Sequence, residues 1–316
     1  MKNTIKIIIA ACMSVLSFGL SGCYEDYVKD FAYTSVFFGS QRPVRTLVTT
    51  TDRDELVFRI GVGLGGVREN VKGYEVKYKL EPELLDTISG ANRYKLLPAG
   101  CYTIENDGDF TFYVQPGKFI GDCEVRINKN AFVALEGSTA NTWALPLRLL
   151  STTADQMVEN LDWTVIVIKY KDELGGDYYS RGWQAKWNGT DIDEATKTEY
   201  YDKDWNQNKV IRTLTTISPT EFSVEGMGSF QKPNNAPADL DHFLIKLIDG
   251  KVKLERKSAT SNNIEDLGSN CEIIDEDTVF FTLDYVYTYE GVSYRVHEQL
   301  KLRQNVEKGL RFEEWT

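Results

Sequence analysis

Apolar side chains occupy every second position over long stretches of this chain. In residues 73–80 they are Tyr74, Val76, Tyr78 and Leu80, and they alternate with charged residues. Because successive side chains of a β-strand point to opposite faces of a sheet, this pattern predicts a strand with one buried face. Further strands are predicted at residues 35–38, 55–64, 110–114, 124–127, 143–149 and 163–170, and one short helix at residues 82–88.

The number and spacing of these strands predict an immunoglobulin-like β-sandwich. About seven strands in about 140 residues, separated by turn residues, are typical of that fold. The last strand runs into a charged stretch with two glycines at residues 171–177, which indicates a domain boundary. We therefore expect residues 31–172 to form the sandwich and residues 173–316 to form a second β-domain.

The strands of the second domain come in successive hairpins. Residues 209–217 pair with 221–224, 242–248 with 251–255, and 279–289 with 292–302 in this prediction. Asp249-Gly250 and Glu290-Gly291 are tight-turn signals, because both central residues of such a turn need positive φ. An antiparallel meander closes most economically into a lipocalin-like β-barrel, since closure removes exposed edges. A second β-sandwich is the alternative.

The N-terminus has the order of a signal peptide. Lys2 and Lys6 precede an apolar stretch over residues 7–20, which predicts a cleaved signal peptide at residues 1–22. Leu20-Ser21-Gly22-Cys23 resembles a bacterial lipobox, which implies acylation of Cys23 with palmitate-type chains, a lipidated linker at 23–30 and an outer-membrane anchor. Glu25-Asp26 resembles the surface-export signal of Bacteroidetes lipoproteins and implies exposure to the cell exterior. An ordinary secretory signal is the alternative.

The charge balance argues against nucleic acid as a partner. The chain has 36 basic and 47 acidic residues and a net charge of −11. Removal of residues 1–22 takes away Lys2 and Lys6, which makes the remaining chain more acidic still. Binding of phosphate backbones needs a basic surface.

No catalytic, cofactor or metal-binding motif is recognisable. His242 and His297 lie in strand patterns and are expected to be structural, and residues 61–66, although rich in glycine, precede no helix that could receive a phosphate. Cys101, Cys123 and Cys271 are expected to be free thiols, with a Cys101–Cys123 disulfide as the alternative. We therefore expect neither catalysis nor a cofactor. The alternative is that the protein is a glycosidase. Its carboxylates would then come from an acidic loop that contains Asp191, Asp193 and Glu194.

Aromatic residues gather at the start of the second domain. The 28 residues from Tyr178 to Trp205 contain seven of them, about twice the 12% found in the whole chain. Tryptophan and tyrosine stack on the C–H faces of sugars, and polar neighbours bind hydroxyl groups. The predicted glycan-binding residues are Trp205, Trp183, Trp187, Tyr200, Tyr201, Arg181 and Asn206. In the alternative interpretation, Tyr178, Trp183 and Trp187 fill the core of the domain.

Several short stretches resemble a family of Bacteroidetes surface lipoproteins. They are Tyr33-Thr34-Ser35-Val36-Phe37-Phe38, Glu83-Leu84-Leu85-Asp86, Tyr94-Lys95-Leu96-Leu97-Pro98, Tyr102-Thr103-Ile104 and Val114-Gln115-Pro116-Gly117-Lys118 in the first domain. Those in the second are Val252-Lys253-Leu254-Glu255-Arg256, Ile264-Glu265-Asp266-Leu267-Gly268 and Leu310-Arg311-Phe312-Glu313-Glu314-Trp315.

The resemblance implies an immunoglobulin-like N-terminal domain of unknown function, followed by an uncharacterised β-domain. It also implies a role in a polysaccharide-utilisation locus. The expected function is non-catalytic binding of an oligo- or polysaccharide for an uptake system, with an outer-membrane transporter and its glycan-binding lipoprotein as partners. A structural or adhesive surface protein, or an accessory subunit of the transporter complex, is the alternative.

Overall fold

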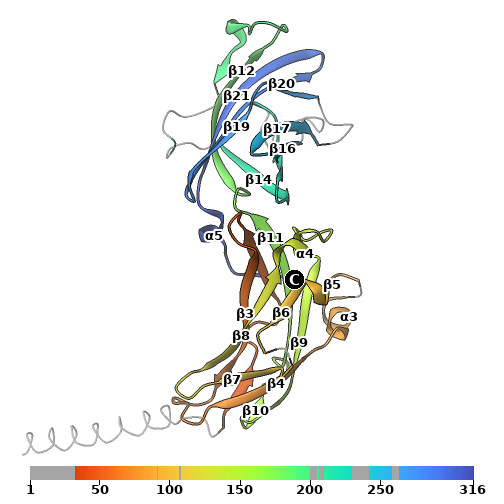
Figure 1. The fold of residues 1–316 in the computed structure, drawn as a ribbon, viewed down its shortest axis with the longest axis vertical. Helices are drawn as coiled ribbons and strands as arrows, with labels where there is room; N and C mark the ends of the chain where they lie inside the picture. Colours follow the sequence, from red (N-terminus) through yellow and green to blue (C-terminus); the bar gives the residue numbers. More distant parts are fainter. Residues whose placement is uncertain are drawn as a thin grey trace, which may run out of the picture.

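A computed structural model describes residues 33–90, 92–106, 108–199, 205, 210–229, 242–257 and 263–316. Nearly all of these residues belong to two β-domains, which are stacked along the long axis of the molecule (Figure 1). The expected all-β fold class is confirmed. None of the described helices is long and apolar enough to cross a bilayer.

The first domain is a sandwich of two sheets. One sheet has the strand order β10 (Gln156–Met157), β1 (Ser35–Phe37), β3 (Glu55–Gly65), β8 (Ile120–Asn128) and β6 (Tyr102–Ile104). The other has the order β22 (Glu313–Glu314), β2 (Pro43–Thr49), β11 (Trp163–Asp172), β9 (Trp143–Thr152), β4 (Tyr74–Leu80) and β7 (Thr111–Val114), with β5 (Lys95–Leu96) paired to β9. The helices α3 (Glu83–Ser89) and α4 (Lys129–Val133) and the short turn η1 (Ala99–Cys101) lie in the connections.

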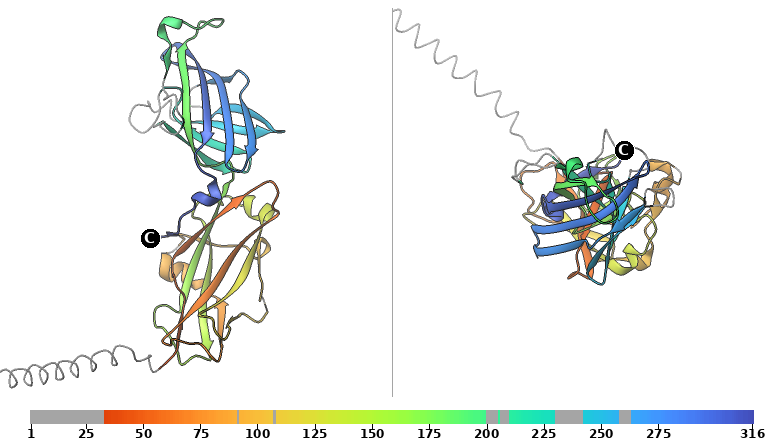
Figure 2. Two further views of the ribbon diagram at one scale, coloured as in Figure 1. Left: turned by 90° about the vertical axis from the view of Figure 1, so that its left-hand side faces the viewer. Right: turned by 90° about the horizontal axis from the view of Figure 1, so that it is seen from above.

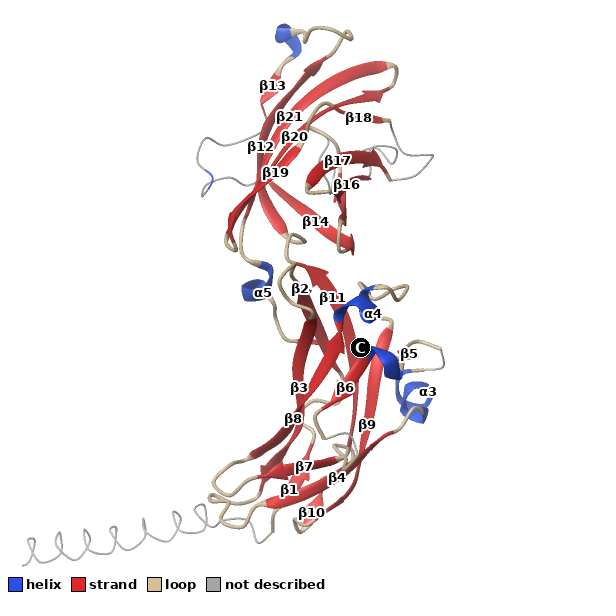
Figure 3. Cartoon of the chain, in the orientation of Figure 1, coloured by secondary structure: helices blue, strands red, loops and turns tan. Residues whose placement is uncertain are grey.

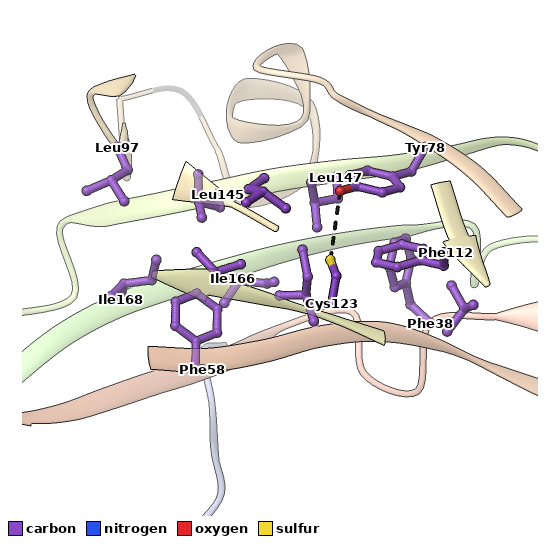
Figure 4. Packing of buried hydrophobic residues seen from close by; sticks show 14 of the residues in the cluster. Phe38, Phe58, Tyr78, Leu97, Phe112, Cys123, Leu145, Leu147, Ile166 and Ile168 are labelled. Carbon is purple, nitrogen blue, oxygen red and sulfur yellow. Dashed lines mark hydrogen bonds between the residues drawn. The ribbon is translucent and has the colours of Figure 1, made fainter. Parts of the chain in front are cut away.

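The alternating residues of the strands meet between the two sheets. Figure 4 shows Phe58 of β3 facing Ile166 and Ile168 of β11. In the same core the rings of Tyr78 and Phe112 stack, with their centroids 4.2 Å apart. Burial of the apolar face is the main stabilising contribution to such a sandwich, at roughly 25 cal/mol per Å².

Two predictions about small side chains are borne out in this domain. Cys101 and Cys123 are buried and free, and the Cys123 sulfur lies 3.9 Å from the Tyr78 hydroxyl (Figure 4). The glycine-rich stretch is part of β3, where a side chain on Gly61 would place its Cβ only 2.5 Å from the carbonyl oxygen of Gly121 on β8. This glycine therefore permits close approach of two strands.

The C-terminal segment returns to the first domain. β22 pairs with the start of β2, and Trp315 is only 4% exposed. Its indole Nε1 donates a hydrogen bond of 2.8 Å to the carbonyl oxygen of Val165, and its ring packs against Tyr94. Our sequence analysis assigns all residues after 172 to the second domain, whereas residues 313–315 complete the sheet of the first.

This return explains why β11 is apolar on both faces. Ile166 and Ile168 point into the sandwich core, while Val165 and Val167 point outward. The outward pair is covered by Trp315 and by Leu84 and Leu85 of α3. A continuous apolar run is typical of a strand that is buried on both sides.

The second domain is a nearly closed barrel, as predicted. Its strand order is β17 (Lys251–Arg256), β16 (His242–Ile248), β15 (Glu221–Glu225), β14 (Ile211–Ser218), β12 (Asp177–Lys186), β21 (Val292–Leu302), β20 (Thr278–Tyr289) and β18 (Ile264–Asp266). In addition, β13 (Thr198–Glu199) pairs with β12, and β19 (Asn270–Asp275) pairs with β20. The amide of Leu254 on β17 donates to a carboxylate oxygen of Asp266 on β18, which connects the two edge strands.

The tight turns of the barrel have the predicted geometry. Asp249 and Gly250 have φ values of 51° and 74°, and Glu290 and Gly291 have φ values of 49° and 77°. Positive φ at both central residues gives a turn whose twist matches that of the two strands. These turns set the register of β16 with β17 and of β20 with β21.

The chain passes twice between the two domains, once at residues 172–177 and once through α5 (Val306–Gly309). On the first crossing, Asp172 accepts hydrogen bonds from the Thr49 hydroxyl (3.1 Å) and the Leu174 amide (3.0 Å). On the second, both terminal nitrogens of Arg53 donate to Glu307. The domains are thereby joined end to end, which gives the elongated shape seen in Figure 2.

Replacement of Trp315 by alanine should destabilise the first domain by about 3–5 kcal/mol, because it leaves a cavity in a closely packed cluster. The measurement is chemical denaturation followed by circular dichroism. Phe312→Ala, at a side chain that is 65% exposed, is the matched control and should leave the free energy of unfolding nearly unchanged. Equal stability of the two variants would show that the C-terminal return contributes nothing.

Burial raises the pKa of Asp172 to about 6 from its usual 3.8. The folded state therefore binds this proton more tightly than the unfolded state, and the free energy of unfolding should fall as pH rises from about 4 to about 7, by at most about 3 kcal/mol. Asp172→Asn should lose this part of the pH dependence, measured by denaturation at a series of pH values. The exposed Asp191→Asn variant should keep the wild-type slope. If the free energy of unfolding depended on pH in the same way in all three proteins, the raised pKa of Asp172 would be contradicted.

Candidate functional site

The interior of the barrel is a packed core. Tyr178, Tyr285, Tyr287, Phe222, Phe243 and Phe281 are fully buried there. The buried Arg212 donates to both carboxylate oxygens of Glu298, at 2.8 and 3.1 Å, and Ser180 donates to the same carboxylate. This ion pair provides hydrogen-bond partners for buried polar groups that would otherwise have none among the apolar rings. The described interior is thus occupied by side chains, which directs attention to the outer surface.

The outer surface of β12 and β21 carries the candidate site. Because Ser180 and Glu298 point inward, the alternate positions on the two paired strands point outward. The outward residues are Tyr179, Arg181 and Trp183 on β12 and Arg295, His297, Gln299 and Lys301 on β21. The register places Arg181 beside Gln299 and Trp183 beside His297. Together with Trp187, Lys197 and Trp205, the residues Arg181, Trp183, Arg295 and His297 are called the outer platform below.

Trp183 lies in the middle of the outer platform and is partly exposed. Its ring stacks on the imidazole of His297 at an interplanar angle of 25° and a centroid distance of 6.1 Å. His297 is held in turn by Asp284 of β20, whose carboxylate oxygen lies 3.0 Å from Nδ1. The ammonium group of Lys197 lies 4.9 Å from the Trp183 ring centroid. The indole is therefore fixed in orientation on a rigid strand.

Trp187 and Trp205 extend the outer platform on two sides of Trp183. Trp187 follows the end of β12, where its amide donates to the Ser293 carbonyl oxygen, and the guanidinium of Arg295 lies 5.3 Å from its ring centroid. The guanidinium of Arg181 lies 4.0 Å from the centroid of the Trp205 ring. Both indoles are partly exposed. Each cation–π contact of this kind contributes about 0.5–2 kcal/mol and orients the ring.

The residues of the aromatic cluster and the other predicted site residues fall into three groups. Trp183, Trp187, Trp205 and Arg181 meet on the outer platform. Tyr178 belongs to the core, which is where the alternative interpretation of the aromatic cluster places it. Tyr200, Tyr201 and Asn206 lie outside the described residues, as does the predicted lipidation site Cys23.

The acidic loop after β12 has a structural role. The Asp193 side chain accepts a hydrogen bond from the Ala195 amide and caps the turn η2 (Glu194–Thr196), while Asn188 accepts from the amides of Thr190 and Asp191. Asp191, Asp193 and Glu194 are exposed. Within the described part of the chain, no group of three or more His, Cys, Asp or Glu side chains converges as metal ligands would.

Sequence reasoning missed the residues of the outer platform that come from β21. Arg295 and His297 lie more than a hundred residues from Trp183 along the chain, so no local pattern connects them. The alternation of β21 indicates that these residues share the face opposite Val296 and Leu300. Only the pairing of β21 with β12 shows that this face is the one that carries the tryptophans.

A depression lies at the junction of the domains, away from the outer platform. It has a volume of about 530 Å³ and is lined by residues of both domains, among them Tyr170, Tyr179, Thr215 and Arg303. Among the described residues, none of the predicted glycan-binding residues lines it. We therefore place the candidate site on the outer platform, which contains Trp183, Trp187, Trp205 and Arg181.

The comparisons with known proteins define the fold and leave the site open. Residues 30–156 match a family model for an N-terminal domain. No curated protein matches this chain. A solved Bacteroides ovatus protein of unknown function superposes with a TM-score of 0.67 at 16% identity, over 90% of this chain and 98% of that one.

Two further solved structures are less similar. A multidomain protein from Bacteroides ovatus, which includes a domain of unknown function, has a TM-score of 0.46 at 11% identity, with 85% of this chain and 94% of that one covered. Another Bacteroides ovatus protein, described as a candidate carbohydrate-binding protein, has a TM-score of 0.32 at 15% identity, with 70% and 66% covered. The chain thus shares its two-domain β-fold with a solved Bacteroides protein, and its function has to be argued from its own residues.

Proposed function

We propose that this protein is a non-catalytic, lipid-anchored outer-membrane protein that faces the cell exterior and binds an oligo- or polysaccharide for a glycan uptake system. The observation that carries the proposal is the set of three partly exposed indoles on the outer platform, each held by a neighbouring cation. A partly exposed tryptophan that is held in orientation by its neighbours suits the stacking of sugar rings, because little conformational entropy is lost on binding.

The elongated shape supports an anchored arrangement. β1, close to the start of the described chain, lies at the end of the sandwich that is remote from the barrel (Figure 3). β12 runs from the domain junction toward the opposite end of the molecule, where β13 lies (Figure 3). In the proposed arrangement the acylated Cys23 holds the first domain near the membrane. The sandwich then acts as a spacer that presents the outer platform to the medium.

The proposed partners are an outer-membrane transporter and the glycan-binding lipoprotein that works with it. The protein would hold the polysaccharide near the transporter without cleaving it. Support for a binding role comes from the acidic loop, whose Asp193 carboxylate is engaged in capping a turn, and from the packed barrel interior.

Replacement of Trp183 by alanine should weaken glycan binding at least about tenfold, since a central aromatic anchor contributes about 2 kcal/mol or more. Affinity electrophoresis against a panel of plant, host and microbial polysaccharides, followed by titration calorimetry on the retained one, is the measurement. Trp205→Ala should also weaken glycan binding. Tyr113→Ala, at a side chain of the first domain that is 46% exposed, is the matched control and should bind as the wild type does.

The bound glycan should keep its chain length after prolonged incubation with the protein. Loss of chain length would contradict the non-catalytic role. Failure of the wild-type protein to retain any polysaccharide, or unchanged binding by a folded Trp183→Ala variant, would contradict the binding role itself.

Cys23→Ser should abolish both lipidation and membrane attachment. The wild-type protein, expressed in a Bacteroides host, should incorporate labelled palmitate, sediment with the outer membrane and be degraded by protease added to intact cells. Two or three acyl chains on one cysteine hold a protein almost permanently, whereas a protein without them has no such anchor. Absence of label on the wild-type protein would contradict the anchor. So would a Cys23→Ser variant that sediments with the outer membrane as well as the wild type does.

A further inference from the structure

The outer platform is cationic, although the chain as a whole is acidic. The outward positions of β12 from Tyr179 to Ala185 and of β21 from Arg295 to Lys301 carry two arginines, one lysine and one histidine, and no acidic residue. Lys197 adds a further positive charge above Trp183. The chain carries 47 acidic and 36 basic residues, so this local excess of positive charge runs against its composition.

The arginines of the outer platform differ in their partners from Arg59 and Arg126 of the first domain, and resemble Arg42 and Arg93, whose guanidinium groups also lie over aromatic rings. In the first domain, Arg59 lies 2.7 Å from a carboxylate oxygen of Asp122 and Arg126 lies 2.8 Å from one of Glu124. Among the residues that the structure describes, no carboxylate lies within 4.0 Å of Arg181 or Arg295. Arg181 donates through Nε to the amide oxygen of Gln299 at 2.9 Å and otherwise packs on Trp205.

Two acidic residues near the outer platform have other partners, whereas Glu199 of β13 is exposed and lies opposite Trp183 across the strand pair. Asp284 holds His297 through Nδ1, at 3.0 Å. Glu194 lies 3.9 Å from the Lys197 ammonium group, at the edge of an exposed turn. The two guanidinium groups therefore keep their charge and their terminal N–H donors without a neutralising carboxylate in the described residues. A guanidinium group presents these donors in a fork that matches the two oxygens of a carboxylate or sulfate.

We infer that the outer platform selects acidic glycans, that is, polysaccharides with uronate or sulfate groups. This inference rests on the proposed glycan-binding function and names its ligand class. Sugar rings would stack on Trp183 and Trp187, while carboxylate or sulfate groups on the same chain accept hydrogen bonds from Arg181 and Arg295. A neutral glycan would leave these guanidinium groups without a charged partner, so discrimination between the two classes comes from the arginines.

The test compares acidic and neutral polysaccharides with the same full-length protein. Polygalacturonate, alginate and chondroitin sulfate form the acidic set, and dextran, xylan and mannan form the neutral set. We expect retention of at least one acidic glycan, no comparable retention of a neutral one, and binding that weakens as sodium chloride is added, because salt screens the charges. Arg181→Gln and Arg295→Gln should each weaken binding about tenfold or more.

Two control variants separate charge on the outer platform from general effects. Arg59→Gln removes a surface arginine of the first domain and should bind as the wild type does. Arg181→Lys keeps the charge and removes the fork, so it should bind more tightly than Arg181→Gln and less tightly than the wild type. Thermal unfolding of each variant identifies any that fail to fold, and the Arg181 pair keeps the test decisive if Arg295→Gln is one of them.

The possible failures are distinguishable. Retention of a neutral glycan that depends on Trp183 and is unaffected by Arg181→Gln would overturn the acidic preference and leave the proposed function standing. Retention of no glycan at all would overturn both. Equal binding of single-stranded DNA, independent of Trp183, would identify a general polyanion surface and also overturn the inference.

Discussion

The antiparallel pairing of β12 with β21 is the constraint on which the site depends. It places Trp183 beside His297 and Arg181 beside Gln299 on the outer surface. The same register places Ser180 next to Glu298 within reach of Arg212 in the interior. A shift of one residue would exchange the two faces of β12 and would bury the tryptophan and arginine side chains while exposing the polar network. The buried ion pair and the outer platform are therefore two consequences of one register.

The C-terminal segment gives this site a fixed position relative to the first domain. Trp315 is inserted between Val165 and Tyr94, and β22 extends the sheet at β2. Since the polypeptide crosses the junction twice, contacts form at both crossings: the Asp172 amide donates to the hydroxyl of Thr216 on β14 at one, and Arg53 donates to Glu307 of α5 at the other. The proposed role as a spacer on the membrane would need such stiffness, because a flexible joint would let the proposed binding surface fold back.

Much of this fold is readable from the alternation of apolar residues. The strands around Phe58 and Tyr78 and the hairpins at Gly250 and Gly291 follow directly from side-chain period and turn chemistry. The sequence analysis does not predict β2, because this strand begins at Pro43. It does not predict β22, because two exposed glutamates show no alternation of apolar and polar residues. The site was only half predictable. Its tryptophans are a local cluster in the sequence, whereas Arg295 and His297 reach them through long-range strand pairing, which no single stretch of sequence encodes.

Hydroxyl-radical footprinting of the full-length protein, with and without a bound acidic glycan, tests the central claim most directly. The account predicts that the glycan protects Trp183, Trp187 and Trp205 from oxidation, while Tyr113 and Phe312 on the first domain remain as reactive as in the free protein. Protection confined to the depression at the domain junction, around Tyr179 and Arg303, with the three indoles unchanged, would contradict it.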